Sequence, residues 1–358
     1  MRKVYVWFGV CLFSFIIFFF SNSQRLVVSP VSLKESISSV LPVTNTLPPL
    51  SLETVFLNTH GESKEIWKDK SWTLVASGDI IPARSVNQQT VKRNDFLWSW
   101  KNIIPILSSG DITLINLESP LVSNCPVTVE GMIFCGDQRH IKGLQSAGVT
   151  VANFANNHMG NYGLKGIQET KQLLEDNAIK ISGLGYPAFV KIQGITVAFL
   201  GFDDIGPHVS PIGKADEEEM KKQIIEANNQ ADVVIVSMSW GVEYTDMPSD
   251  RQIFLGHLVI DSGADLIIGN HPHWMQPIEL YKGKMIAYAH GNTIFDQMWS
   301  EKTKVGVIGK YIFYGKDLVD VEFIPTYIKE YGQPEILSGR EKDAILESLQ
   351  QQSNRMSF

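Results

Sequence analysis

At residues 267–274 the sequence reads IIGNHPHW, an apolar run followed by two histidines, His271 and His273, one residue apart. The apolar residues indicate a buried strand, and a strand end holds its side chains rigidly. Two imidazoles at this spacing can reach one metal ion or two adjacent ones. On these residues alone, a loop carrying two solvated histidines is the alternative interpretation.

Four other apolar runs also end in polar side chains, several of them of kinds that bind metal ions. The residues that follow these runs are Asp79, Glu118, the pair Asn157 and His158, and the block Ser239-Trp240-Gly241. Open α/β sheets place their sites at the carboxyl ends of the strands, so we expect these residues to lie together with His271 and His273. Such a mixed oxygen and nitrogen set suits divalent Mn, Fe, Zn or Mg ions.

From Trp72 onward, short β-branched runs alternate with helical patterns, which indicates an α/β fold. The expected strands are 73–77, 112–116, 150–154, 196–202, 233–237, 266–268 and 285–289, and the expected helices are 164–176, 216–230 and 249–262. Residues 305–313 and 318–327 indicate an antiparallel hairpin.

The N-terminus predicts a membrane segment. Arg2 and Lys3 precede an uncharged run from Val4 to Phe20, which is at the short end for a transmembrane helix. A cleaved signal peptide is the competing interpretation, but the residues from Ser21 to Gln24 match its cleavage site poorly. An uncleaved signal-anchor is favoured, and the positive-inside rule then places the bulk of the chain outside the cytoplasm, in a single-pass protein of the cell membrane.

The expected organisation has four parts, of which the second is a tether rich in Ser and Pro. These parts are an N-terminal signal-anchor helix (1–21), an extracytoplasmic linker (22–70), an α/β domain (71–331) and a C-terminal tail (332–358). Cys125 and Cys135 flank a short segment, and an oxidising compartment favours a disulfide between them, with two free thiols as the alternative.

The charge balance argues against nucleic acid as a partner. The formal net charge is −7, and without Arg2 and Lys3 the chain carries 29 basic against 38 acidic residues. A polyanion-binding surface would need an excess of Lys and Arg.

The order and spacing of the polar blocks resemble the bacterial capsule-synthesis family associated with poly-gamma-glutamate, of the CapA or PgsA type. The resemblance extends from about Trp72 to Gln297 and includes GDII at 78–81 with Arg84, NLESP at 116–120, ANNH at 155–158, WGVEY at 240–244, HPH at 271–273 and FDQ at 295–297. It implies a calcineurin-like metallophosphoesterase fold, a four-layer α-β-β-α sandwich with a metal site at the strand ends.

The resemblance also implies roles for individual residues. The metal ligands would be Asp79, Glu118, Asn157, His271 and His273, which would hold one or two divalent ions. His158 would stabilise a leaving oxygen, and Arg84 would neutralise a bound phosphate. Substrate-binding residues would be Trp240, Glu243 and Asn292, although Glu243 could equally be a surface carboxylate and Trp240 could fill the core.

Two residues depart from the family pattern. Ser239 stands where the family usually has a histidine, and Asn161 stands where it usually has an aspartate. Serine is a poor metal ligand, and an amide removes a negative charge beside His158. Both changes are expected to weaken metal binding.

Two functions therefore remain open. The first is a membrane-anchored enzyme of capsule or surface-polymer synthesis that hydrolyses or transfers a phosphoester with a metal-bound hydroxide. The second is a non-catalytic accessory subunit of a polymer synthase or export complex with a degenerate metal site. The expected partners are a cell-surface polymer or phosphorylated substrate, the membrane, and capsule synthase subunits.

Overall fold

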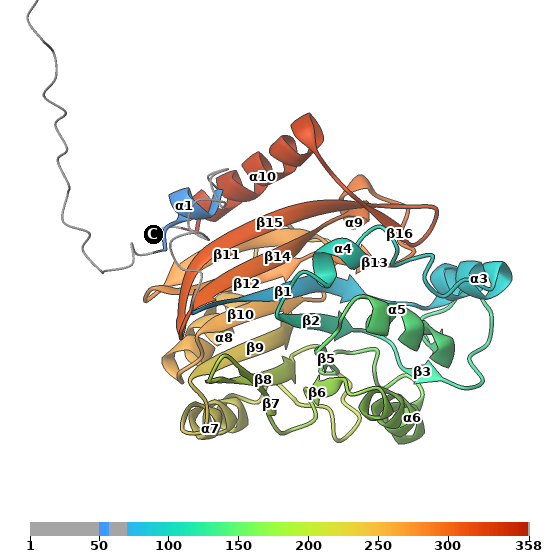
Figure 1. The fold of residues 1–358 in the computed structure, drawn as a ribbon, viewed down its shortest axis with the longest axis horizontal. Coiled ribbons are helices and arrows are strands. Elements are labelled where there is room, and N and C mark those ends of the chain that lie inside the picture. The colour runs from blue at the N-terminus through green and yellow to red at the C-terminus, as the bar shows by residue number, and fades with distance from the viewer. Residues whose placement is uncertain (1–49, 57–69, 357–358) are drawn as a thin grey trace, which may run out of the picture. The chain divides into compact units, whose positions relative to one another are not determined.

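The structure, a computed structural model, describes residues 50–56 and 70–356. The expected signal-anchor and most of the expected linker lie outside the described residues. No helix in the described ranges is both long enough and apolar enough to cross a bilayer. Residues 50–56 and 70–356 belong to one structural unit, a mixed α/β arrangement of several sheets (Figure 1).

The larger sheet has the strand order β16-β15-β14-β1-β2-β5-β6, and β13 pairs with β1. Strands β1, β2, β5 and β6 are parallel, whereas β14, β15 and β16 are antiparallel to their neighbours. The bounds are Ser71–Ile80 (β1), Ile112–Leu117 (β2), Val151–Asn153 (β5), Lys180–Ser182 (β6), Asn292–Ile294 (β13), Val305–Tyr314 (β14), Asp317–Lys329 (β15) and Gln333–Ile336 (β16). The expected hairpin is thus formed by β14 and β15.

The second sheet has the order β11-β12-β10-β9-β8-β7, with parallel central strands and antiparallel edges. Its strands are Ala188–Ile192 (β7), Ile195–Asp203 (β8), Val233–Ser239 (β9), Leu266–Asn270 (β10), Met275–Tyr281 (β11) and Lys284–His290 (β12). A short pair, Leu121–Val122 (β3) and Gly136–Asp137 (β4), stands apart.

The helices lie outside the two sheets. They are Leu52–Phe56 (α1), Arg84–Arg93 (α3), Ile104–Leu107 (α4), Ile141–Ser146 (α5), Gly163–Asp176 (α6), Glu217–Asn228 (α7), Asp250–Asp261 (α8), Glu301–Lys304 (α9) and Gly339–Asn354 (α10), with a 3-10 turn at Gln138–His140. Helix α8 begins with a capping box, in which Ser249 and Gln252 satisfy each other's backbone N–H groups.

Side chains along the central strands alternate between two apolar layers. One layer lies between the sheets and contains Leu74, Leu114 and Val151 of the larger sheet with Phe199, Ile235 and Ile268 of the smaller one. The other faces of the smaller sheet pack on α7 and α8 through Phe202, Met238 and Ile267. This alternation fixes which side chain at each strand end points between the sheets.

The C-terminal residues differ from the expected polar tail. Strand β16 pairs with β15, and α10 lies along β15 and β11 with α1 beside it (Figure 1). Leu349 of α10 is buried in the layer between the sheets. Ser353 is also buried, and its Oγ accepts a hydrogen bond from Ile278 N at 3.0 Å and donates to Leu349 O at 2.8 Å. Only a few residues of α10 pack on the sheets, so its mostly polar sequence does not indicate a packed helix.

Candidate functional site

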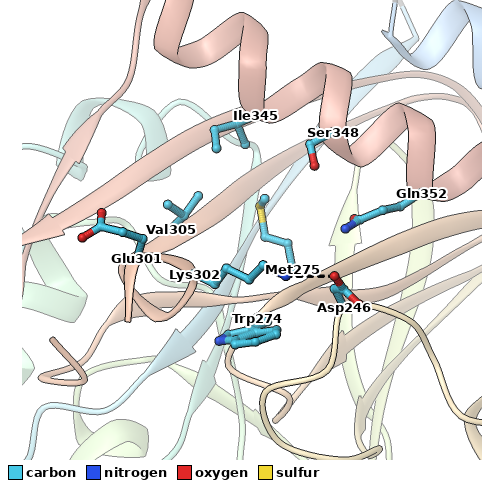
Figure 2. A pocket seen from close by; sticks show the side chains of 9 residues that line it. All are labelled: Asp246, Trp274, Met275, Glu301, Lys302, Val305, Ile345, Ser348 and Gln352. Carbon is cyan, nitrogen blue, oxygen red and sulfur yellow. Dashed lines mark hydrogen bonds and ion pairs between the residues drawn. The ribbon is translucent and has the colours of Figure 1, made fainter. Parts of the chain in front are cut away.

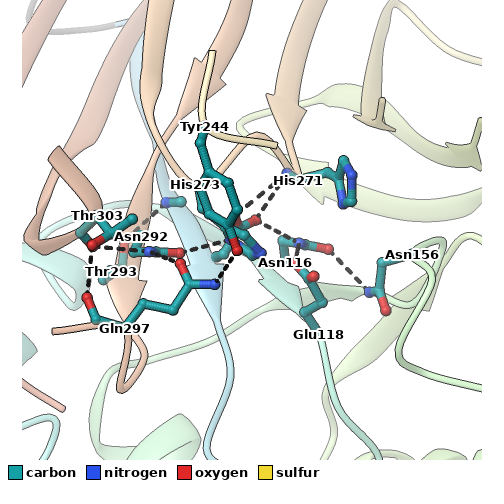
Figure 3. A network of polar contacts seen from close by, with 12 residues as sticks. Asn116, Glu118, Asn156, Tyr244, His271, His273, Asn292, Thr293, Gln297 and Thr303 are labelled. Carbon is teal, nitrogen blue, oxygen red and sulfur yellow. Dashed lines mark hydrogen bonds and ion pairs between the residues drawn. The ribbon is translucent and has the colours of Figure 1, made fainter. Parts of the chain in front are cut away.

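Asp79, at the end of β1, is buried within a polar cluster, and Figure 3 shows other members of this cluster, among them Asn116, Glu118 and His273. Its Oδ1 accepts a hydrogen bond from Asn116 Nδ2 at 3.0 Å, and its Oδ2 lies 3.1 Å from His273 Nδ1. The backbone N–H of His271 also points at this carboxylate. Burial by itself disfavours the charge of Asp79, but the His273 ring and the Asn116 amide hold its pKa below the ordinary value.

Glu118 shares the Asn116 amide with Asp79. Asn116 Nδ2 donates to Glu118 Oε2 at 3.0 Å, and the Asn116 Oδ1 accepts from Asn153 and Asn156. Burial and the nearby Asp79 carboxylate raise the pKa of Glu118 well above its ordinary value. The Asn116 amide therefore holds two carboxylates side by side at the ends of β1 and β2.

The two histidines that follow β10 have unusual backbone conformations. His271 has φ +92° and His273 has φ +59°, in the left-handed region that non-glycine residues rarely adopt. Such strain persists where a site over-determines the geometry. His273 Nδ1 contacts the oxygens of both Asp79 and Asn292, so this nitrogen carries the hydrogen and Nε2 is the nitrogen left for a ligand. Burial lowers the pKa of His271 to about 3.

Asn161 positions the ring of His158. Asn161 Oδ1 accepts from His158 Nδ1 at 3.0 Å and from Phe134 N at 2.6 Å, and the Phe134 ring stacks on the imidazole with centroids 4.1 Å apart. Burial lowers the pKa of His158. The neighbouring Asn157 has its Oδ1 buried without a hydrogen-bond partner among the described residues.

A cavity of about 360 Å³ opens above this cluster. Its lining includes Arg84, Phe134, His158, Glu243, Tyr244, His273, Asp296, Gln297 and Trp299. Arg84, predicted to bind phosphate, is paired with Asp296, donates from Nη1 to Gly131 O, and lies over the Phe134 and Phe295 rings. An incoming phosphate would therefore compete with Asp296 for this guanidinium.

One wall of the cavity is the segment closed by a disulfide between Cys125 and Cys135. Val129 and Met132 of this segment line the cavity, although Met132 is 63% exposed. Phe134, at its end, packs on His158. The disulfide thus restrains a segment that contacts both Arg84 and His158.

Removing this disulfide is expected to destabilise the protein. The cross-link closes a segment of 10 residues, and the loss of chain-entropy restraint predicts about 2–3 kcal/mol. Urea unfolding of the Cys125→Ala/Cys135→Ala variant should show this loss, and reducing agent should lower wild-type stability equally while leaving the variant unchanged. Equal midpoints for oxidised and reduced wild type would contradict the prediction.

The three residues expected to bind substrate occupy different places. Glu243 lines the cavity, with Tyr244 beside it. Asn292 is fully buried, and its amide is engaged by His273 and by Thr303 O at 2.9 Å, so it orients His273 rather than facing the cavity. The prediction for Trp240 is wrong, since its ring is fully buried against α8 and its Nε1 donates to Tyr288 O.

Trp274 lies in a second, smaller cavity of about 190 Å³ between β11, α9 and α10 (Figure 2). Lys302 Nζ stands 4.3 Å from the centre of the Trp274 ring and 2.8 Å from Asp246 Oδ2. Trp274 therefore does not line the cavity above Asp79, whereas the exposed Trp299 does.

The donor atoms of the site fit a divalent cation only in part. Across residues 50–56 and 70–356, no three His, Cys, Asp or Glu side chains already converge as a metal site. Asp79 and His273 bond to each other, and Asn116 occupies one oxygen of each carboxylate. Several buried oxygen and nitrogen atoms nevertheless have no hydrogen-bond partner within those ranges: Glu118 Oε1, Asn157 Oδ1, Asn270 Oδ1 and His271 Nδ1. Buried polar atoms without a hydrogen-bond partner indicate a binding position for a ligand or ion. This oxygen-rich set suits a hard divalent cation.

Two residues of this cluster were missed by sequence reasoning. Asn116 precedes Glu118 in the same block, but its amide was not considered. Asp203 ends β8, one residue beyond the strand expected at 196–202. The strand-end rule used for the other residues would have found Asp203 if that strand had been extended by one position.

The geometry defines a mixed α/β protein with a polar cluster of carboxylate, amide and imidazole groups at the strand ends. Residues 73–297 match the family described as bacterial capsule synthesis protein PGA_cap, and the chain belongs to this family.

Relatives and a solved structure are similar to parts of the chain. The PGA biosynthesis protein CapA of Bacillus subtilis is 33% identical over 255 residues, which cover 65% of this chain and 66% of that protein. The capsule biosynthesis protein CapA of Bacillus anthracis is 28% identical over 80% of this chain and 75% of its own length. Among solved structures, a phosphatase from Mycoplasma pneumoniae is similar with a TM-score of 0.48 and 12% identity, covering 71% of this chain and 93% of that one.

Proposed function

We propose that this chain is a membrane-anchored, extracytoplasmic phosphoesterase-like protein in the synthesis of a capsule polymer of the poly-gamma-glutamate type. It hydrolyses or transfers a phosphoester on a four-layer metallophosphoesterase-like sandwich. The observation that carries this proposal is the set of contacts around Asp79 at the strand ends, beneath a cavity. Asp79 bonds to the His273 ring and to the His271 backbone N–H, and it shares the Asn116 amide with Glu118. The names of the two Bacillus relatives support the assignment to capsule synthesis.

The residues that would hold one or two divalent cations are Asp79, Glu118, Asn157, His271 and His273. When bound, a divalent cation supplies positive charge to phosphate oxygens and activates water. His158 lines the cavity and bonds to Asn161 through Nδ1, so its Nε2 is the nitrogen available to a leaving oxygen. Arg84 stands at the cavity wall and would exchange its contact with Asp296 for a phosphate oxygen.

The extracytoplasmic location rests on two features. The uncharged run from Val4 to Phe20 fits a signal-anchor, with the linker to residue 70 as a tether. The disulfide between Cys125 and Cys135 fits an oxidising compartment.

A non-catalytic accessory subunit of a polymer synthase or exporter is the second candidate. Ser239, where the family usually has a histidine, favours it, because a hydroxyl is a poor substitute for an imidazole ligand. Its cavity would then bind polymer or a synthase subunit without turnover.

The test uses the full-length protein purified in detergent, with bis(4-nitrophenyl) phosphate and Mn²⁺ or EDTA. We expect cation-dependent hydrolysis that falls about 100-fold or more in His271→Ala. The control is His257→Ala on α8, where His257 pairs with Glu279 at 2.9 Å and stacks on Tyr281. Cation binding without turnover would favour the accessory subunit over the enzyme. If the protein neither binds the cation nor turns over the substrate, the metal site itself is contradicted.

A further inference from the structure

Three neighbouring strands of the smaller sheet end in polar residues that lie in register. Asp203 of β8 pairs with Ser239 of β9, and Ser239 pairs with Asn270 of β10. In-register residues of adjacent strands point to the same face of a sheet. Phe202 and Met238, one residue earlier, pack toward α7 and α8, so Asp203, Ser239 and Asn270 point between the two sheets.

This row faces the polar end of the larger sheet. Gly201, two residues before Asp203 and on the same face of β8, lies against Asn153 of β5. A Cβ atom at position 201 would stand 1.9 Å from Asn153 Oδ1, so only glycine permits this approach. Asn153 in turn bonds to Asn116, which contacts Asp79 and Glu118. The row and the Asp79 cluster therefore lie on opposite walls of the same gap.

The two walls differ in how their polar atoms are satisfied. The amides of Asn116 and Asn153 are occupied by protein partners. In contrast, Asn270 Oδ1 has no hydrogen-bond partner in the ranges described, and the Asp203 carboxylate has the Ser239 hydroxyl as a side-chain partner, although the three residues are at most 2% exposed. His208 Nε2 stands 3.3 Å from Asp203 Oδ2 but bonds to the Asp203 carbonyl at 2.7 Å. A buried carboxylate beside a buried amide oxygen that has no partner is costly unless a ligand occupies the position.

We propose that Asp203, Ser239 and Asn270 line a binding position for a hard divalent cation of the Mg²⁺ or Mn²⁺ class, with the Asp203 carboxylate as its charged ligand. This inference rests on the proposed function, since it names further ligands and the cation class of the same site. Carboxylate, hydroxyl and amide oxygens suit Mg²⁺ and Mn²⁺, whereas Zn²⁺ gains most from imidazole and thiolate. The Asp203 carboxylate compensates for the imidazole that is absent at position 239.

The charge distribution supports a cation here. Asp79, Glu118 and Asp203 are three buried carboxyl groups, at most 1% exposed. The two sides of the gap are close together, because Gly201 of β8 lies against Asn153 and Asn153 bonds to Asn116. Buried carboxylates of like charge are tolerated when a cation is coordinated between them.

The experiment measures metal affinity rather than activity. Full-length protein in detergent is stripped with EDTA and titrated with Mn²⁺ and, separately, Zn²⁺ by calorimetry, with bound metal counted by mass spectrometry. Asp203→Asn should weaken Mn²⁺ binding about tenfold or more and Zn²⁺ binding less. The matched control is Asp204→Asn, because Asp204 turns outward to Arg251 at 3.2 Å, and its Mn²⁺ affinity should stay within about twofold of wild type.

Ser239→His provides an independent readout. An added imidazole should raise the ratio of Zn²⁺ to Mn²⁺ affinity about tenfold or more. Unchanged Mn²⁺ affinity in Asp203→Asn, or an unchanged ratio in Ser239→His, would overturn this proposal. If Asp79→Asn still loses the metal in those cases, the proposed function stands without the Asp203 row. If wild type binds neither ion, both proposals fail together.

Discussion

Asp79→Asn is expected to lower the affinity for Mn²⁺ by about 100-fold or more, above the 10- to 100-fold loss that removal of an outer-shell partner causes. Asp79 is fully buried and contacts His273, the His271 backbone and Asn116, so its charge lies at the centre of the cluster. The substitution keeps the shape of the side chain, removes its charge and replaces one acceptor oxygen by an NH2 group. Calorimetric titration of the EDTA-stripped protein measures the effect.

The control for this variant is a carboxylate before a strand of the smaller sheet, far from the strand ends that form the site. Asp265 precedes β10, accepts a hydrogen bond from Val234 N at 2.8 Å and pairs with Lys284. Asp265→Asn should leave Mn²⁺ affinity within about twofold of wild type, because its charge lies at the amino ends of the strands. Equal losses in both variants would indicate a general effect of charge or stability rather than a site at Asp79.

Trp240→Ala is expected to destabilise the protein by about 3–5 kcal/mol. The Trp240 ring is fully buried, stacks on Tyr288 and donates from Nε1 to the Tyr288 carbonyl at 2.8 Å. Alanine would leave a cavity beside α8 and would remove the hydrogen bond to the Tyr288 carbonyl. Thermal or urea unfolding of the purified protein in the absence of metal measures the loss.

Trp299→Ala separates the role of a core tryptophan from that of a cavity tryptophan. Trp299 is 61% exposed and lines the cavity above Asp79. Its removal should change stability by no more than about 0.5 kcal/mol. The placement of the two rings would be contradicted if Trp240→Ala lowered the free energy of unfolding by less than about 1 kcal/mol. It would also be contradicted if the two variants lost the same amount.

The convergence of Asp79, His271 and His273 was accessible from the sequence for a clear physical reason. Parallel strands in an α/β sheet end at one edge, so the residues after apolar runs meet even when they are far apart in the chain. Asp79 and His273 are 194 positions apart and still contact each other. The prediction needed only the strand ends and their direction.

Trp240 shows a rule that was available but not applied. Side chains alternate along a strand, so a residue next to a site residue points to the opposite face. Ser239 points between the sheets, and Trp240 therefore faces α8. A residue directly next to a site residue in an extended segment is therefore expected to point away from the site.

Other features could not be derived from local pattern. The pair Arg84 and Asp296 joins residues 212 positions apart, and neither belongs to an apolar run that would predict the contact. The packing of α10 depends on a few buried residues such as Leu349 in an otherwise polar helix. Long-range pairing of this kind is determined by the assembled fold.

The most direct test of the central claim is a crystal structure of the protein soaked in Mn²⁺, with anomalous diffraction recorded at the manganese edge. The account predicts an anomalous peak in the gap between the two sheets, contacted by Asp79 or Glu118 on one side and by Asp203 on the other. If crystals soaked at a saturating Mn²⁺ concentration show no anomalous peak in that gap, or show manganese only at surface carboxylates, the account is contradicted.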